Sequence, residues 1–207
     1  MTAAGLSFVH RFEPGTVPGH PPVLLLHGTG GDEGSLLELG RAMAPGSPLL
    51  SPRGKVLEHG MSRFFRRLAE GVFDEEDVKR RAHELADFVA AARETYGLAA
   101  PVALGFSNGA NIAAALLLLR PEALSGAVLL RAMVPLADPP AARLAGKPVL
   151  MLTGVSDPIV PADNAARLAS MLVQAGAEVT HRTLPVGHGL SQPDVTMTRD
   201  WVERLRP

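Results

Sequence analysis

A serine flanked by two glycines is the feature that most constrains how this chain can fold. The apolar run Val102-Ala103-Leu104 stops at Gly105, Ser107 follows, and an alanine- and leucine-rich run begins directly after Gly109. This order predicts a strand, a sharp turn and a helix. Side chains at the two glycine positions would collide with neighbouring strand or helix backbone, and glycine avoids this because it has no Cβ atom. The pattern therefore predicts a strained turn that carries Ser107.

Ser107 also has a simpler interpretation. Serine is a favoured N-cap residue, and a serine between a strand and a helix can serve only to cap the helix. A short motif remains a hypothesis until its structural context supports it. The rest of the chain has to decide between a reactive serine and a capping serine.

The composition indicates an ordinary globular protein. With 207 residues, of which 46% are hydrophobic and 20% charged, the chain is long enough to bury a substantial core, and we expect one domain over residues 1–207. The net charge of −1 gives no sign of a nucleic-acid or membrane partner. The sequence has no cysteine, which excludes disulfides, thiolate metal sites and a cysteine nucleophile.

Three observations favour a cytoplasmic protein. The start of the chain, Met1 to Leu6, contains neither the basic segment nor the apolar core of a signal peptide. The longest apolar run, Ile112 to Leu119, is too short to cross a bilayer. The lack of cysteine also fits a reducing compartment.

Apolar runs and helical periodicities alternate along the chain. Strands are expected over 6–12, 22–26, 49–50, 101–104, 126–133, 148–153 and 177–184. Helices are expected over 35–44, 74–96, 110–119, 161–175 and 192–206. The segment 55–73 has no clean period, and we expect a loop or short flap there. The alternation predicts the α/β class, with a mostly parallel sheet and helices on both faces. The first two strands are expected to pair as an antiparallel hairpin at one sheet edge.

Chemically capable side chains follow four of these strands. In a parallel sheet, function gathers at the carboxyl ends of the strands. The loop His27-Gly28-Thr29-Gly30-Gly31 follows one strand, and Ser107, Asp157 and His188 each follow a later one. We therefore expect a serine, an acid and a histidine to meet at one edge of the sheet.

Together these three residue types can perform nucleophilic catalysis. A serine hydroxyl is a poor nucleophile until a base removes its proton, and His188 is the candidate base. Asp157 would hold the imidazole in one tautomer and stabilise its protonated form. A developing oxyanion needs two N–H donors, for which we expect the backbone amides of Asn108 and Thr29. This context favours the catalytic interpretation of Ser107 over the capping one.

Other acids and histidines fit these roles less well. Asp138 also follows a strand and is a minor alternative to Asp157, whereas Asp163 is placed to begin a helix. His181 lies inside an expected strand, where a structural role is common, and His27 is expected to brace its loop. No spacing of ligands indicates a metal site. The glycines after His27 lack the ending of a phosphate-binding loop.

Four segments together resemble a known family: Leu26-His27-Gly28-Thr29-Gly30-Gly31-Asp32-Glu33, Gly105-Phe106-Ser107-Asn108-Gly109, Asp157-Pro158-Ile159-Val160-Pro161 and Gly187-His188-Gly189-Leu190. They resemble the phospholipase/carboxylesterase branch of the α/β-hydrolases, which includes bacterial carboxylesterases and acyl-protein thioesterases, and the resemblance covers nearly the whole chain. It implies the α/β-hydrolase fold without a large cap domain. It also implies hydrolysis of short acyl esters without a cofactor.

Two details refine this resemblance. The stretch from Ser51 to Asp74 is more similar to a bacterial subgroup of small esterases that includes hydroquinone- or quinone-linked hydrolases. Acyl-protein thioesterases usually carry glutamine directly after the nucleophile, where this chain has Asn108. Because the backbone amide is the donor at that position, we expect little effect on oxyanion binding, but the difference counts against removal of acyl groups from proteins.

The sequence constrains substrate choice less than it constrains the reaction. Arg53 follows a strand and could bind a substrate carboxylate, but we favour an ion pair with an acid such as Glu58 or Glu70 that holds the flap. Four apolar residues are candidates to line an acyl pocket, although each alone is more typical of a core: Phe64, Phe65, Met133 and Leu190.

We therefore expect a serine carboxylesterase that hydrolyses short-chain or small carboxylic esters through an acyl-enzyme on Ser107. Two alternatives remain open: a thioesterase or lysophospholipase that uses the same three residues, and a non-catalytic ligand-binding protein with the same fold. Long acyl chains would need a long apolar groove, and only 4% of the residues are aromatic. The expected partner is a small ester, with no nucleic acid and no membrane, and both a monomer and a homodimer remain open.

Overall fold

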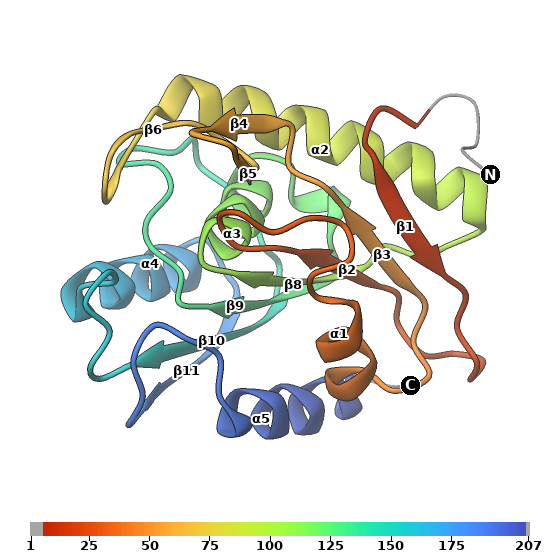
Figure 1. Cartoon of the computed structure of the whole chain (residues 1–207). Helices are drawn as coiled ribbons and strands as arrows, with labels where there is room; N and C mark the ends of the chain where they lie inside the picture. Colours follow the sequence, from red (N-terminus) through yellow and green to blue (C-terminus); the bar gives the residue numbers. More distant parts are fainter. Residues whose placement is uncertain (1–5, 206–207) are drawn as a thin grey trace.

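A seven-stranded sheet forms the centre of the computed structural model, which describes residues 6–205 (Figure 1). The strand order is β1-β3-β2-β8-β9-β10-β11, and every neighbouring pair except β1 and β3 is parallel. The strands are β1 (His10–Glu13), β2 (Val23–Leu26), β3 (Leu49–Pro52), β8 (Val102–Phe106), β9 (Gly126–Leu130), β10 (Pro148–Gly154) and β11 (Glu178–Leu184). The mostly parallel sheet expected from the sequence is confirmed.

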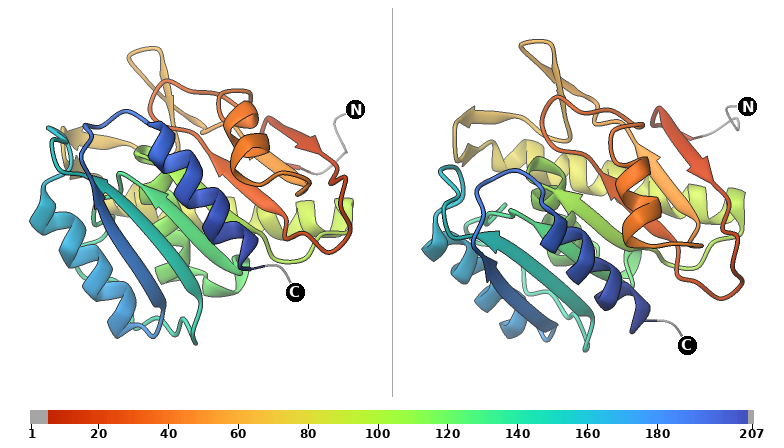
Figure 2. Two further views of the ribbon diagram at one scale, coloured as in Figure 1. Left: turned by 90° about the horizontal axis from the view of Figure 1, so that it is seen from below. Right: turned by 60° about the horizontal axis from the view of Figure 1, so that its bottom comes forward.

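Helices cover both faces of the sheet, as expected (Figures 1 and 2). The helices are α1 (Leu37–Met43), α2 (Glu75–Tyr96), α3 (Asn108–Leu119), α4 (Ala162–Gln174) and α5 (Gln192–Glu203), with a short 3-10 helix at Pro121–Ala123. α1 and α5 pack on one face, and α2, α3 and α4 pack on the other. The expected end of the last helix at 206 lies outside the described residues.

Alternate residues of the central strands face the two helical layers. In β2, Leu24 and Leu26 belong to the core under α2, α3 and α4, whereas Val23 and Leu25 belong to the core under α1 and α5. Successive side chains of a strand point to opposite faces. A strand covered on both faces therefore needs apolar residues at every position, which explains the continuous apolar runs in the sequence.

One edge of the sheet differs from the expectation. β1 pairs with β3 and not with β2, which lies between β3 and β8. All of β2 is buried, as a central strand requires, whereas β1 is only partly buried, as suits an edge strand. The hairpin expected between the first two strands is therefore wrong, because the fully apolar second strand is stabilised by neighbours on both sides.

The segment expected as a loop or flap forms two small hairpins. β4 (Val56–Glu58) pairs with β5 (Met61–Arg63), and β6 (Arg67–Ala69) pairs with β7 (Val72–Phe73), both antiparallel. Figure 1 shows them in orange and yellow, beside α2. Strands of two or three residues are too short to produce a periodic pattern, so the sequence shows no clear signal for them.

A fully buried ion pair ties the sheet to α5. β9 ends earlier than expected, because Arg131 adopts a φ of 59° and leaves the extended conformation. Its guanidinium donates twice to the Asp194 carboxylate, at 2.8 Å each, and both side chains are 0% exposed. It also donates to the carbonyl oxygens of Gly187 at 3.1 Å and Gly189 at 3.2 Å. These two residues flank His188, so the pair holds the loop after β11 against the sheet.

Loss of Asp194 is expected to destabilise the protein strongly. Asp194→Ala would leave the Arg131 charge buried without its partner, which costs about 3–5 kcal/mol of unfolding free energy. Asp200→Ala on the same helix is the matched control, because Asp200 is exposed and surface changes usually cost less than about 0.5 kcal/mol. Urea unfolding of both variants measures the difference. Equal losses would contradict a stabilising role of the buried pair.

Candidate active site

Ser107 lies on the sharp turn between β8 and α3. Its φ of 52° and ψ of −114° are costly for a residue that has a Cβ atom. A Cβ atom on Gly105 would overlap the carbonyl group of Gly109, and one on Gly109 would overlap the carbonyl group of Leu26. Both glycines are therefore needed for β8, α3 and the end of β2 to approach so closely.

The Ser107 hydroxyl is paired with His188 and makes no capping bond to the helix. The Nε2 atom of His188 lies 3.0 Å from Ser107 Oγ. The Nδ1 atom of the same ring lies 2.9 Å from Oδ2 and 3.1 Å from Oδ1 of Asp157. Because a carboxylate can only accept, Nδ1 is assigned the proton, which leaves Nε2 as the acceptor that faces the hydroxyl.

The Asp157 carboxylate is fully buried but well supplied with donors. Its side chain is 0% exposed, and Oδ1 accepts hydrogen bonds from the backbone amides of Ile159 at 2.8 Å and Val160 at 3.1 Å. A buried carboxylate needs such partners to keep its charge.

The other acids considered from the sequence lie elsewhere. The minor alternative, Asp138, lines a separate cavity. Asp163 accepts a hydrogen bond from the Asn164 amide at the start of α4.

The two residues expected to supply the oxyanion donors, Asn108 and Thr29, come from different backbone segments. Asn108 is the first residue of α3, where amides have no partner within the helix and the helix dipole favours negative charge. Thr29 comes from the loop after β2. Both residues line the same cavity as Ser107 and His188.

The cavity beside Ser107 is small and partly apolar. Its volume is about 240 Å³. Its apolar wall consists of Phe73, Phe106, Met133, Ile159 and Val160. The turn of the β6–β7 hairpin contributes Glu70 and Gly71, so this hairpin covers part of the cavity.

The four apolar candidates for an acyl pocket have different locations. Met133 lines the cavity. Phe64 and Phe65 are buried in the core, and the Phe64 ring packs against His27 with centroids 4.7 Å apart. Leu190 packs against the core under α5. Only Met133 of these is among the residues that line the cavity, because the end of β5 turns both phenylalanine rings inward.

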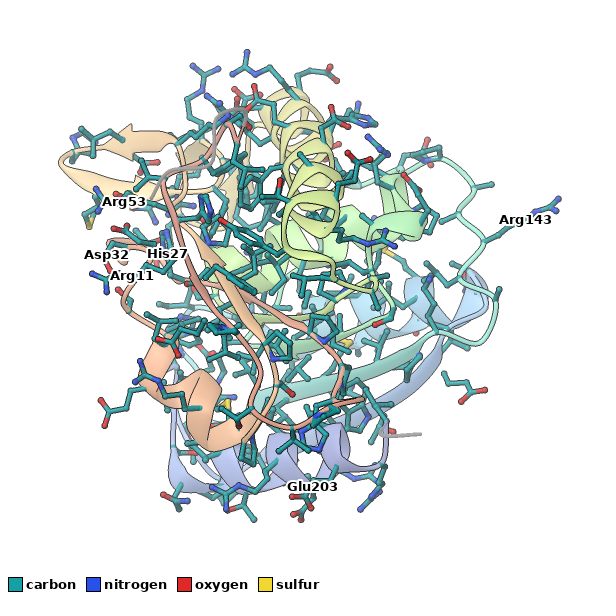
Figure 3. All side chains as sticks on the ribbon, turned by 90° about the vertical axis from the view of Figure 1, so that its right-hand side faces the viewer. Arg11, His27, Asp32, Arg53, Arg143 and Glu203 are labelled. Atoms are coloured by element: carbon teal, nitrogen blue, oxygen red, sulfur yellow. The ribbon has the colours of Figure 1, made fainter. Side chains whose placement is uncertain are left out.

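Arg53 forms an ion pair and does not line the cavity. Its guanidinium donates to both carboxylate oxygens of Glu33, at 2.5 and 2.9 Å. The ion pair favoured from the sequence is confirmed, but its partner is Glu33 and not one of the two acids named as examples. Glu58 pairs with Arg63 and Arg67, and Glu33 is in reach of Arg53 because β2 and β3 end side by side. Figure 3 shows Arg53 next to Asp32 and His27 on this side of the molecule.

His27 braces the loop after β2. Its Nε2 atom accepts a hydrogen bond from the Gly54 amide at 3.0 Å, and Nδ1 donates to the Gly28 carbonyl at 2.7 Å. The ring is therefore neutral, with its proton on Nδ1. Burial lowers the pKa of His27 below its ordinary value of 6.5.

Two arginines next to the site were missed by the sequence analysis. Arg63 donates through Nη1 to Thr29 Oγ1 at 2.5 Å, and Arg131 holds the loop of His188. Arg63 lies in the segment without a clean period, which offered no signal. Arg131 interrupts the otherwise apolar run from Leu129 to Met133, and a charge at that position is the signal that could have found it.

Because His27 is buried with a lowered pKa, we expect the stability of the protein to depend on pH. Because the pKa is lower in the folded state, the unfolded state binds more protons below the ordinary value of 6.5. The contribution to stability is therefore complete above that pH and declines as the pH falls below it. His27→Gln keeps an acceptor for the Gly54 amide but cannot titrate.

Urea unfolding at about pH 7.5 and about pH 5.5 tests this pH dependence of stability. Carboxylates titrate mainly below this interval and therefore contribute little to the change. The wild type should lose more stability than His27→Gln over this interval. Burial also lowers the pKa of His181, but that histidine is present in both proteins, so its effect cancels in the comparison. Equal losses would show that His27 does not need to be neutral.

Within residues 6–205, no group of three or more His, Asp or Glu side chains is arranged to hold a metal ion. In the same range, no helix is long and apolar enough to cross a membrane.

Comparisons with known proteins point to one family. Residues 10–205 match the family model described as phospholipase/carboxylesterase. The protein named "Putative hydrolase MhqD" of Bacillus subtilis (strain 168) is 43% identical over 194 residues, which cover 93% of this chain and 96% of that protein.

Solved structures are similar over nearly their whole length. The carboxylesterase of Bacillus cereus superposes with a TM-score of 0.93 at 44% identity, covering 97% of this chain and 95% of that one. YahD, solved with malic acid, superposes with a TM-score of 0.90 at 30% identity, covering 95% and 98%. The fold of this chain and its similarity to these proteins lead to the same conclusion. The chain belongs to the phospholipase/carboxylesterase family of α/β-hydrolases and is a hydrolase.

Proposed function

We propose that this hydrolase is a serine carboxylesterase that cleaves small carboxylic esters through an acyl-enzyme on Ser107. The observation that carries the proposal is the unbroken chain of contacts from Ser107 Oγ to His188 Nε2 and from His188 Nδ1 to Asp157, at 3.0 and 2.9 Å. This chain ends in a hydroxyl that lines a cavity. Nucleophile, base and orienting acid in this geometry are the requirements for acyl transfer.

In the first half of the reaction, Ser107 Oγ attacks the ester carbonyl while His188 Nε2 takes the hydroxyl proton. Asp157 stabilises the imidazolium that forms. The carbonyl oxygen becomes an oxyanion, which accepts hydrogen bonds from the backbone amides of Asn108 and Thr29. His188 then returns the proton to the leaving alcohol, and the acyl group remains on Ser107.

In the second half, water replaces the alcohol. His188 removes a proton from the water, whose oxygen attacks the acyl-enzyme, and the same two amides stabilise the second oxyanion. The proton returns to Ser107 Oγ as the carboxylic acid leaves. No atom or electron is needed beyond the ester and water, so the cycle requires no cofactor.

The size of the cavity supports a small acyl group. A volume of about 240 Å³ is below the range of about 300–1,000 Å³ that is usual for larger ligands. The β6–β7 hairpin, with Glu70 and Gly71, covers part of it. YahD, which is 30% identical to this chain, was solved with malic acid, a small carboxylic acid.

Fluorophosphonate labelling tests the nucleophile. The wild type should be labelled on one residue, and Ser107→Ala should not be labelled and should lose at least about 10³-fold in ester hydrolysis. Ser170→Ala is the matched control, because Ser170 is exposed on α4 and should be labelled as fast as the wild type. A folded wild type that resists labelling would favour the non-catalytic alternative.

A series of p-nitrophenyl esters tests the acyl preference. kcat/KM should fall at least about tenfold from butyrate to octanoate, because the longer chain exceeds the cavity. Met133→Ala removes a side chain from the cavity wall and should shift the preference toward longer chains. A wild type that prefers octanoate, or a matched acyl thioester over the oxygen ester, would support the lysophospholipase or thioesterase alternative.

A further inference from the structure

Three consecutive residues at the end of β5 contact both segments that carry the proposed oxyanion donors. We call residues 62–64 the β5 clamp. The bonds run from Gly30 N to Ser62 O (2.9 Å), from Arg63 Nη1 to Thr29 Oγ1 (2.5 Å) and from Phe64 N to Asn108 Oδ1 (2.7 Å). The clamp therefore joins the loop after β2 to the first residue of α3.

We propose that Arg63 is a positioning residue for hydrolysis at Ser107. Arg63 holds Thr29 in place, so that the backbone amides of Thr29 and Asn108 face the same oxyanion. The inference rests on the proposed function, because it assigns a role within the same reaction. Arg63 acts through Thr29 and is not itself assigned a contact with the reacting atoms.

Thr29 needs an external support. It is exposed and stands between Gly28 and Gly30, and Gly30 has a φ of 82°. Glycine-rich segments outside helices and strands have many accessible conformations. Asn108, by contrast, belongs to α3 and is 1% exposed. Of the two donors, Thr29 is therefore the one whose position depends most on side-chain contacts.

Arg63 is suited to this role because it is itself held firmly. Its side chain is 4% exposed, and Nε donates to the Phe65 carbonyl at 3.2 Å and lies 3.4 Å from Glu58. Glu58 is also bonded to Arg67 at 2.7 Å. A guanidinium fixed on several sides can present one N–H in a constant direction.

The expected consequence is a loss in kcat. Removal of an oxyanion donor typically costs about 10²–10³-fold in kcat, and a displaced donor costs part of that. We expect Arg63→Met to lower kcat on p-nitrophenyl acetate about 10–100-fold with little change in KM. Affinity for a trifluoromethyl ketone, whose adduct on Ser107 carries an oxyanion, should fall by a similar factor.

Arg63 also lines the cavity, so direct binding of a negative substrate group is a competing explanation. That role would raise KM for esters that carry a carboxylate and leave neutral esters unaffected. Use of a neutral ester therefore separates the two explanations.

The test is a double-mutant cycle on the full chain with Arg63→Met, Thr29→Val and both together. Thr29→Val removes the acceptor Oγ1 but keeps the backbone amide, and it changes an exposed residue, so the fold should persist. Because both changes break one contact, the double variant should be no slower than the slower single variant. Arg66→Met is the control: Arg66 is the neighbouring exposed arginine, pairs with Asp74 and should keep wild-type kinetics.

Multiplicative losses in the double variant, an effect on KM alone, or wild-type kcat in a folded Arg63→Met protein would each overturn the inference. Fluorophosphonate labelling keeps this result separate from the proposed function. If the wild type is labelled on Ser107 while Arg63→Met retains full activity, only the role of Arg63 fails. If the wild type is not labelled, the proposed function fails first.

Discussion

The strained turn at Ser107 is the constraint on which the site depends. At its positive φ, the serine hydroxyl makes no capping bond to α3 and is in contact with His188. The turn is possible only where β8, α3 and the end of β2 meet without side chains between them, which is the role of Gly105 and Gly109. The central strands are parallel, so their carboxyl ends, and the loops that carry Asp157 and His188, lie at the same edge of the sheet.

Loops at such an edge need supports that the sheet does not provide. Two buried arginines next to the cavity supply them. Arg131 bonds to the carbonyls on either side of His188 and is neutralised by Asp194. Arg63 bonds to Thr29 and lies near Glu58. In both cases a guanidinium with several fixed donors holds a loop in place: the loop of His188 for Arg131 and the loop of Thr29 for Arg63.

The sequence predicts the features that depend on local pattern. Continuous apolar runs identify the central strands, and the order of glycine, serine, acid and histidine predicts that Ser107, Asp157 and His188 lie together. Features that depend on contacts between distant segments are not visible in this way. The pairing of β1 with β3 and the choice of Glu33 as the partner of Arg53 are examples. The two short hairpins were missed because strands of two or three residues have no detectable period.

In the proposed reaction, Ser107 carries the acyl group during turnover. To test for this acyl-enzyme, the enzyme is mixed with a slowly deacylating ester and quenched in acid within milliseconds. Its peptides are then mapped by mass spectrometry. We predict an acyl adduct on the peptide that contains Ser107, formed before the carboxylic acid accumulates and lost as the acid appears. Hydrolysis at the full rate with no adduct, or an adduct on another residue, would contradict it.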